Sequence, residues 1–281
     1  MVEGRNALNH YRPGKDPYVA AHILERLPLV VGDRGIFIVG MFSYFRWVDD
    51  EADERVDLTK SQKLEFIDRE MKLADGQPPQ NPLRMEIVFE NLPWHAVPQQ
   101  EARGQVKILL SSIADDVSHQ GYLVRSEQEI TDYNRRTILP VVTGLFLSLN
   151  GKSPELSDPL LELLDAYIRI GSLEGLGDDL RQGVLKLPLK SKETGVTSVE
   201  EVLAEYDRQK FNETKWSNLF KILRNIGSFA YLNIPAWQKA ACIIYMCADV
   251  LVKKPLFVQR EKAVKGLSER QSINRLSVLE R

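Results

Sequence analysis

Apolar residues recur every three or four positions along most of the chain, which is the pattern of amphipathic helices. Clear examples are residues 58–74, 100–120 and 160–182. Stretches rich in proline and glycine, such as 75–82, separate these segments and predict loops. No segment alternates convincingly between apolar and polar residues, so the pattern predicts an all-α chain of about ten helices.

Capping signals indicate where two of these helices begin. Ser126 and Ser198 each stand three residues before a glutamate, as in the capping box, where a hydroxyl and a carboxylate satisfy the first backbone N–H groups. The first box predicts a helix over 126–149, which continues through a proline, and the second predicts a helix over 198–211. Further helices are expected over 18–27, 83–92, 215–231 and 235–252, and a turn at 32–35.

One helical segment differs from the rest, because it is apolar nearly all round and ends in acids. The apolar run covers residues 36–45, and five carboxylates fall within residues 49–54. Like charges that share a helix face repel unless something neutralises them. The acidic run is either a solvated helix end or the binding site of a hard cation such as Mg²⁺ or Mn²⁺, completed by substrate phosphates. The residues at helical spacing on one face are Arg46, Asp49, Asp50 and Asp53.

Composition narrows the class of protein without naming a function. The chain has 281 residues, of which 43% are hydrophobic and 27% charged, as in ordinary globular domains. The net charge of −2 gives no support for nucleic-acid binding. We expect residues 1–14 to form a loose arm and residues 15–281 a single helical domain, because no low-complexity joint divides the chain.

Cysteine usage and apolar run lengths bear on the compartment. Cys242 and Cys247 lie in an apolar helical pattern without zinc spacing, which is typical of core thiols in a reducing compartment. The N-terminus lacks the apolar core of a signal peptide, and the longest apolar runs are shorter than the ~20 residues of a membrane span. We therefore expect a cytoplasmic protein, which a greasy substrate would bring into transient contact with a membrane surface.

The acidic helix end carries a family resemblance. An aromatic-rich helix, an arginine, two residues and then Asp-Asp-x-x-Asp form the first motif of squalene/phytoene synthases, which are trans-isoprenyl diphosphate synthases. The stretch from Tyr44 to Glu54 resembles that motif, with Arg46 in register. The resemblance implies a prenyl diphosphate substrate, a phosphate contact for Arg46, and Mg²⁺ ligation by Asp49, Asp50 and Asp53. It also implies catalytic roles for Arg46, Asp49 and Asp53.

Residues 171–188 resemble the family's second motif, and order and spacing match from about residue 15 to 265. The spacing from the acidic pair to a glycine and a proline is preserved. The resemblance implies metal ligation by Asp178 and Asp179, with Glu174 one helical turn before them as a replacement carboxylate. Arg181 and Lys186 stand next to this cluster and are expected to bind substrate phosphate.

Aromatic residues are a further set of candidates. Residues 126–133 resemble the family's acidic, tyrosine-containing helix start, which makes Tyr133 a catalytic candidate. The faces of Tyr44, Phe42 and Tyr133 could stabilise a carbocation by cation–π contact. The alternative for each of these rings is plain core packing.

The chain also departs from the family's pattern. Gly171, Glu174 and Gly175 replace the Asn, Arg and first Asp of the second motif. The family's N-terminal Ser-x-Ser-Phe is absent, and Lys15, which could contact a phosphate, stands there instead. Residues 137–144 replace a Val-Ala-Gly-x-Val-Gly stretch.

These features favour a Mg²⁺-dependent enzyme that ionises a farnesyl- or geranylgeranyl-type diphosphate and forms a new C–C bond with a second acceptor. The protein would act as a monomer or homodimer. One alternative is prenyl transfer to an aromatic acceptor, or terpene formation from a single substrate. Another is a non-catalytic family relative that serves as an assembly or binding protein.

Overall fold

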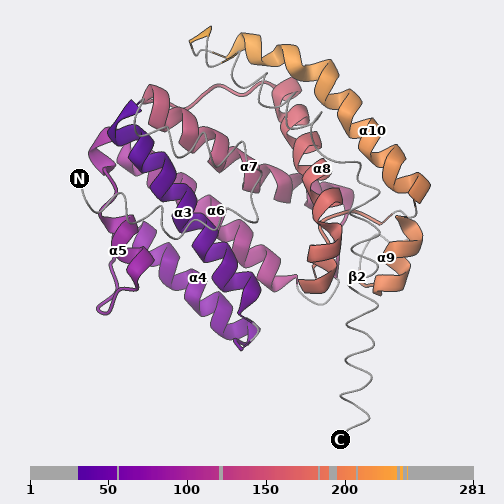
Figure 1. Cartoon of the computed structure of the whole chain (residues 1–281), viewed down its shortest axis with the longest axis horizontal. Coiled ribbons are helices and arrows are strands. Elements are labelled where there is room, and N and C mark those ends of the chain that lie inside the picture. Colours follow the sequence, from indigo (N-terminus) through magenta and orange to yellow (C-terminus); the bar gives the residue numbers. More distant parts are fainter. Residues whose placement is uncertain are drawn as a thin grey trace, which may run out of the picture. The chain divides into compact units, whose positions relative to one another are not determined.

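The computed structural model describes residues 31–55, 57–119, 123–182, 184–189, 195–206, 208–232, 235, 236 and 239. Almost all regular structure in these residues is helical, as the sequence predicts (Figure 1). The exceptions are two strands of two residues each, β1 (Leu123–Val124) and β2 (Gly195–Val196), which pair antiparallel. Lys15, the helix expected over 18–27 and most of the helix expected over 235–252 lie outside the described residues.

The chain forms two compact units, each built from two stretches of sequence. Unit 1 comprises Met1–Ser118 and Leu139–Pro154, and unit 2 comprises His119–Ile138 and Glu155–Arg281. Helix α7 (Glu127–Asn150) contributes its first half to unit 2 and its second half to unit 1. The single domain expected over residues 15–281 stays a prediction.

Helix α3 is the element around which unit 1 is packed, because it contacts every other helix that precedes α7 in the described chain. Helix α3 supplies Phe37, Tyr44 and Val48 to the core, and each is almost fully buried. Helices α4 and α6 also pack extensively on each other. The helices of this part are α3 (Asp33–Glu54), α4 (Lys60–Ala74), α5 (Arg84–Glu90), the 3₁₀ turn η2 (Trp94–Ala96) and α6 (Gln99–Ser118).

Two helices in unit 1 begin at positions that differ from the predicted ones. The turn expected at 32–35 is wrong in its extent, because α3 already begins at Asp33, directly after Gly32 with its positive φ of 59°. Thr59 caps α4 through a capping box with Gln62, a threonine–glutamine pair that had not been recognised in the sequence. This cap matters because the first backbone N–H groups of a helix have no partner inside it.

Among the described helices of unit 2, α8 and α10 make the most extensive contact. Capping boxes at Ser126 and Ser198 are confirmed, since each serine and the following glutamate bond reciprocally. The core includes Leu173, Leu180 and Val202, all at most 1% exposed. The helices of this part are α8 (Asp158–Gln182), α9 (Val199–Glu205), α10 (Arg208–Asn225) and the 3₁₀ segment η3 (Ile226–Tyr231).

The boundaries predicted between 198 and 231 were wrong. The helix expected to reach residue 211 ends at Glu205, and the next begins at Arg208 instead of residue 215. Tyr206 explains the break, because its backbone leaves the helical region (φ −95°, ψ 54°) while its hydroxyl donates a hydrogen bond of 2.5 Å to the carbonyl of Pro188. Burial of the Tyr206 ring therefore overrides the local helical pattern.

None of the described helices combines the length and the apolar content that crossing a membrane requires.

Candidate functional site

The last turns of α3 carry the acidic motif of unit 1 on a half-exposed face. Arg46 binds Asp49 at 3.4 Å and Asp50 at 3.0 Å, so the arginine partly neutralises the two carboxylates three and four residues on. The side chains of Arg46, Asp49 and Asp50 are 38%, 45% and 36% exposed, which leaves them accessible to a ligand in solution. Asp53, one turn further on, is half-buried.

A second arginine balances the charge beyond the motif. Arg55 bonds to Glu51 at 2.9 Å and to both carboxylate oxygens of Asp57 at 2.8 Å. The hydrogen bonds from Arg55 lower the pKa of Asp57 to about 2, so this carboxylate stays ionised. Asp49 and Asp50 are thus paired with Arg46, and Glu51 and Asp57 with Arg55.

A buried polar network fixes α3 from behind this face. The hydroxyl of Tyr44 donates to Glu70 Oε2 on α4 at 2.6 Å, and its ring lies 4.5 Å from that of Phe89, centroid to centroid. Glu70 in turn shares a hydrogen bond with Glu86 on α5, and both carboxyl groups are fully buried. Arg69 closes the network with two bonds of 2.6 and 2.7 Å to Glu86. Tyr44 is 0% exposed, so its ring packs in the core of unit 1.

The two buried glutamates hold different charge states. Burial raises the pKa of Glu70 to about 8, and the hydrogen bond from Tyr44 only partly offsets that rise. Burial also acts on Glu86, but hydrogen bonds from Arg69, from Glu70 and from the backbone of Leu83 outweigh it and lower the pKa. Since two carboxylates cannot share a hydrogen bond unless one holds a proton, Glu70 carries the proton and Glu86 the charge.

The carboxylates on α3 are suited to hold a hard cation only together with ligands from a substrate. Among the described residues, no three His, Cys, Asp or Glu side chains gather closely enough to bind a metal ion by themselves. Mg²⁺ in phosphate-binding sites is held by one or two carboxylates while substrate oxygens and water fill the other positions. Asp49 and Asp53, one helical turn apart beside Arg46, match that smaller requirement.

The second motif lies in unit 2, at the end of α8. Asp179 is 8% exposed, and Lys186 Nζ lies 3.5 Å from its Oδ1. A methyl group added at Gly175 would lie 3.9 Å from Asp179 Oδ2, so the carboxylate reaches back along its own helix to the preceding turn. The side chains of Glu174, Asp178 and Arg181 lie outside what the structure describes. The two acidic motifs therefore belong to different units.

The remaining predicted aromatics have contrasting surroundings. Tyr133 is 5% exposed, and the guanidinium of Arg125 lies 4.5 Å above its ring. One face of Tyr133 is therefore already occupied by a cation of the protein. Phe42 is half-buried on α3.

Unit 2 also contains an ionic network that was not predicted from the sequence. Arg169 on α8 bonds to Asp165 at 2.8 Å, to Thr131 at 2.9 Å and to Glu127 at 2.8 Å. Asn134 donates to the other oxygen of Asp165 at 2.8 Å. The spacings 127, 131 and 134 on α7 and 165 and 169 on α8 are helical, and that periodicity could have revealed one polar stripe facing another.

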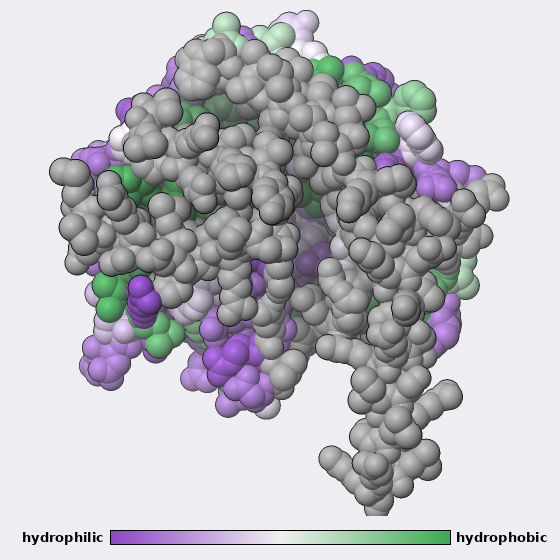
Figure 2. All heavy atoms as spheres, in the orientation of Figure 1, coloured by the Kyte–Doolittle hydropathy of each residue, from purple (hydrophilic) through white to green (hydrophobic). Residues whose placement is uncertain are grey.

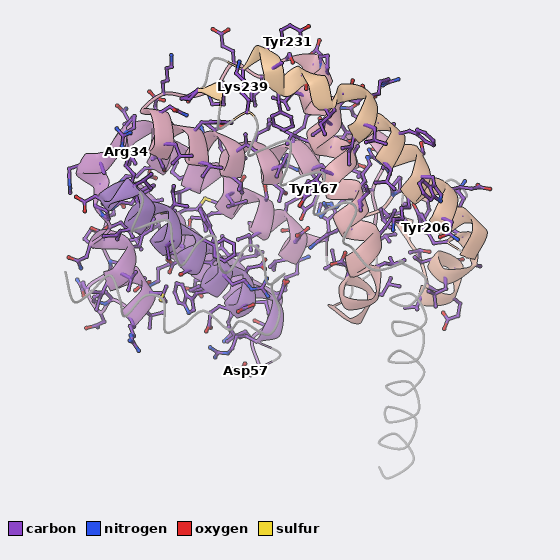
Figure 3. All side chains as sticks on the ribbon, turned by 45° about the horizontal axis from the view of Figure 1, so that its top comes forward. Arg34, Asp57, Tyr167, Tyr206, Tyr231 and Lys239 are labelled. Carbon is purple, nitrogen blue, oxygen red and sulfur yellow. The ribbon has the colours of Figure 1, made fainter. Side chains whose placement is uncertain are left out.

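A cavity of about 740 Å³ lies in unit 2 beside this network. Arg125 and Arg169 form part of its wall and are almost completely buried. Tyr206, labelled in Figure 3, belongs to the same wall, together with Lys210 and Lys221 of α10. Asp179 and Lys186, the described unit 2 residues predicted to bind metal and diphosphate, are not among the residues that line this cavity.

Comparisons with known proteins find a likeness in fold but no relative by sequence. No family model matches the chain, and no curated protein matches it by sequence. A solved structure, the crystal structure of a dehydrosqualene synthase in complex with ligand, superposes with a TM-score of 0.55. It shares 12% sequence identity, and the match covers 96% of this chain and 99% of that one. The chain therefore has the all-α fold of isoprenoid synthases.

Proposed function

We propose that this protein is a prenyltransferase that depends on Mg²⁺, or on Mn²⁺ in its place. Its substrate would be an allylic diphosphate of the farnesyl or geranylgeranyl class, and its product would contain a new C–C bond. The observation that carries this proposal is the half-exposed face of α3, where Arg46 lies beside Asp49 and Asp50 with Asp53 one turn on. The likeness in fold to a dehydrosqualene synthase supports it.

The residues of α3 would bind the diphosphate end of the substrate. Asp49 and Asp53 would hold the divalent cation, which stabilises the charge that develops on the leaving diphosphate. Arg46 would exchange part of its pairing with the aspartates for a hydrogen bond to a phosphate oxygen, a bond that strengthens as negative charge builds up.

The proposed reaction is balanced without an oxidant or reductant. The allylic C–O bond breaks, and its electron pair leaves with the diphosphate. The electron pair of an acceptor double bond then forms the new C–C bond, and a proton is lost from the resulting cation. The site must be apolar around the prenyl chain of the substrate, because water would otherwise capture the carbocation.

A specific observation favours a second candidate, a non-catalytic protein that binds prenyl diphosphates or assembles with a partner. Gly171, Glu174 and Gly175 stand where the resembled motif has amide, guanidinium and carboxylate groups. A glycine can neither ligate a metal nor hold a phosphate through a side chain. The first motif would then remain as a binding site, while the second motif keeps only Asp178 and Asp179 in place.

The test is incubation with farnesyl diphosphate and Mg²⁺, followed by assay of released pyrophosphate and mass spectrometry of the organic products. We expect pyrophosphate release, with a loss of about 100-fold or more in Asp49→Asn and Asp53→Asn, since charge stabilisation at a reacting oxygen contributes that order. Asp115→Asn on α6 is the matched control and should keep full activity. Unchanged turnover in Asp49→Asn contradicts the metal role, and binding without turnover selects the second candidate.

A further inference from the structure

Helix α10 has a second apolar face besides the one it packs on α8. Leu219 and Ile222 are 7% and 2% exposed and belong to the interior of unit 2. Trp216, Phe220 and Leu223, at i, i+4 and i+7, are 60%, 67% and 58% exposed. Helical spacing aligns these three side chains in one stripe, which we call the α10 outer face. The packing of α10 on the described residues of unit 2 gives no reason for such a stripe.

The apolar surface continues past the end of the helix. Tyr231, at the end of η3, is 87% exposed, the highest value among the large exposed hydrophobic residues of the described chain. Tyr231 is labelled in Figure 3. Figure 2 shows hydrophobic atoms gathered along the edge where Figure 1 places α10.

Charge on α10 contrasts with that of the whole chain. The helix carries five cations against one acid, Glu213, a net charge of +4 in a protein whose net charge is −2. Each residue of the α10 outer face has a cation next to it in sequence. The three neighbouring cations are Lys215, Lys221 and Arg224. Arg224 also bonds to Glu162 of α8 at 2.6 Å, so its position at the edge of the stripe is fixed.

We infer that the α10 outer face docks onto a membrane surface that contains anionic lipids. Trp216, Phe220 and Leu223 enter the boundary between headgroups and acyl chains, as the apolar side of an interfacial helix does. Cationic side chains of α10, of which Arg224 is 66% exposed, place their charged ends in the headgroup layer, next to lipid phosphates. This site is independent of the proposed prenyl transfer, because it uses no residue of either acidic motif.

Charge favours a lipid surface over a second copy of the chain. In a two-fold symmetric dimer the same face meets itself, so two helices of net charge +4 would be brought together. Like charges placed opposite each other across an interface disfavour association. An anionic bilayer offers the opposite charge together with an apolar layer of the right depth.

The test is co-sedimentation of the full chain with vesicles of phosphatidylcholine alone and of phosphatidylcholine mixed with an equal amount of phosphatidylglycerol. We expect binding to the mixed vesicles that weakens as salt is raised, since the attraction to anionic lipid is screened. Trp216→Ser/Phe220→Ser/Leu223→Ser should reduce the partition coefficient at least about tenfold. Lys215→Gln/Lys221→Gln should reduce it by a similar factor on mixed vesicles only. Ile87→Ser/Ile108→Ser removes exposed apolar groups elsewhere and is the matched control.

Two further measurements keep the test independent of folding. Vesicles with brominated lipid should quench the tryptophan fluorescence of the wild-type protein. Trp216→Phe should lose that quenching, while its circular dichroism spectrum should match that of wild type. Equal vesicle binding by the triple serine variant and wild type would overturn the inference, as would absence of binding to either vesicle. A dimer by sedimentation that the triple variant abolishes would overturn it too, and would identify a second copy as the occupant.

Discussion

In the core of unit 1, Tyr44 of the acidic helix α3 donates a hydrogen bond to the titratable side chain of Glu70. Glu70 holds a proton between Tyr44 and Glu86, and its pKa of about 8 lies well above the usual 4.5. A group whose pKa is raised on folding stabilises the fold fully below its unfolded pKa, and that stabilisation is lost as the pH rises through the folded value. The stability of unit 1 should therefore decline between about pH 4.5 and pH 8.

Glu70→Gln tests this linkage, because the amide reproduces the protonated acid. Its oxygen can accept from Tyr44, and its NH₂ can donate to Glu86. We expect the variant to be close to wild type at about pH 5 and more stable by at least about 1 kcal/mol at about pH 9, measured by urea unfolding at both values. Glu65→Gln, on the exposed side of the same helix, should keep the wild-type pH dependence. A parallel decline in wild type and Glu70→Gln would contradict the assignment of the proton.

Sequence spacing predicted the local part of this chemistry and missed the rest. Arg46 reaches Asp49 and Asp50 because three- and four-residue separations bring side chains together on any helix. Glu70 lies 26 residues from Tyr44, and Arg69 lies 17 from Glu86. Such pairings depend on how three helices pack, which no local pattern encodes. For the same reason the sequence did not show that Tyr44 would be fully buried.

Helices as elements were predictable where their ends carry chemical signals. Capping boxes at Ser126 and Ser198 and the proline- and glycine-rich loop at 75–82 correspond to observed boundaries. The break between α9 and α10 carries no such signal, since it depends on the bond between Tyr206 and Pro188. Strands β1 and β2 were missed because two residues are too few to show alternation.

Gly40 on α3 marks a close contact between elements. A methyl group at this position would lie 2.3 Å from Cδ2 of the buried Leu92, whereas one at Gly104 on α6 would meet nothing within 4 Å. Gly104→Ala should stabilise the protein by about 0.5–1 kcal/mol, because alanine restricts the unfolded chain. Gly40→Ala should destabilise it by about 1–3 kcal/mol through overpacking. Guanidinium unfolding of both variants decides this, and equal stabilisation would show that Leu92 moves aside freely.

At the scale of the whole molecule, the fold was predicted more fully than the site. The helical pattern agrees with the full-length likeness in fold to a dehydrosqualene synthase. The acidic motif of α3 and the pair at Asp178–Asp179 fall in different units. Their mutual placement depends on long-range packing, so motif spacing along the chain could not supply it.

Thermal unfolding of the complete chain offers a test of the diphosphate site without turnover. A ligand that binds only the folded state at about 100 times its Kd adds about 2.7 kcal/mol of stability. For a chain of this size we expect Mg²⁺ with pyrophosphate to raise Tm by about 5 °C or more. Asp49→Asn/Asp53→Asn should abolish the shift, and Asp115→Asn/Asp116→Asn should retain it. An equal shift in both double variants would place the anion elsewhere on the molecule.

The path of α7 through both units affects how the protein emerges during synthesis. Residues 119–138 belong to unit 2, yet they are made before residues 139–154, which complete unit 1. Domains of a chain often fold one after another as they leave the ribosome. Here the first unit cannot finish until part of the second has already emerged. A nascent chain that has reached only residue 118 still lacks the last segment of unit 1, so the earliest complete folding unit extends to residue 154.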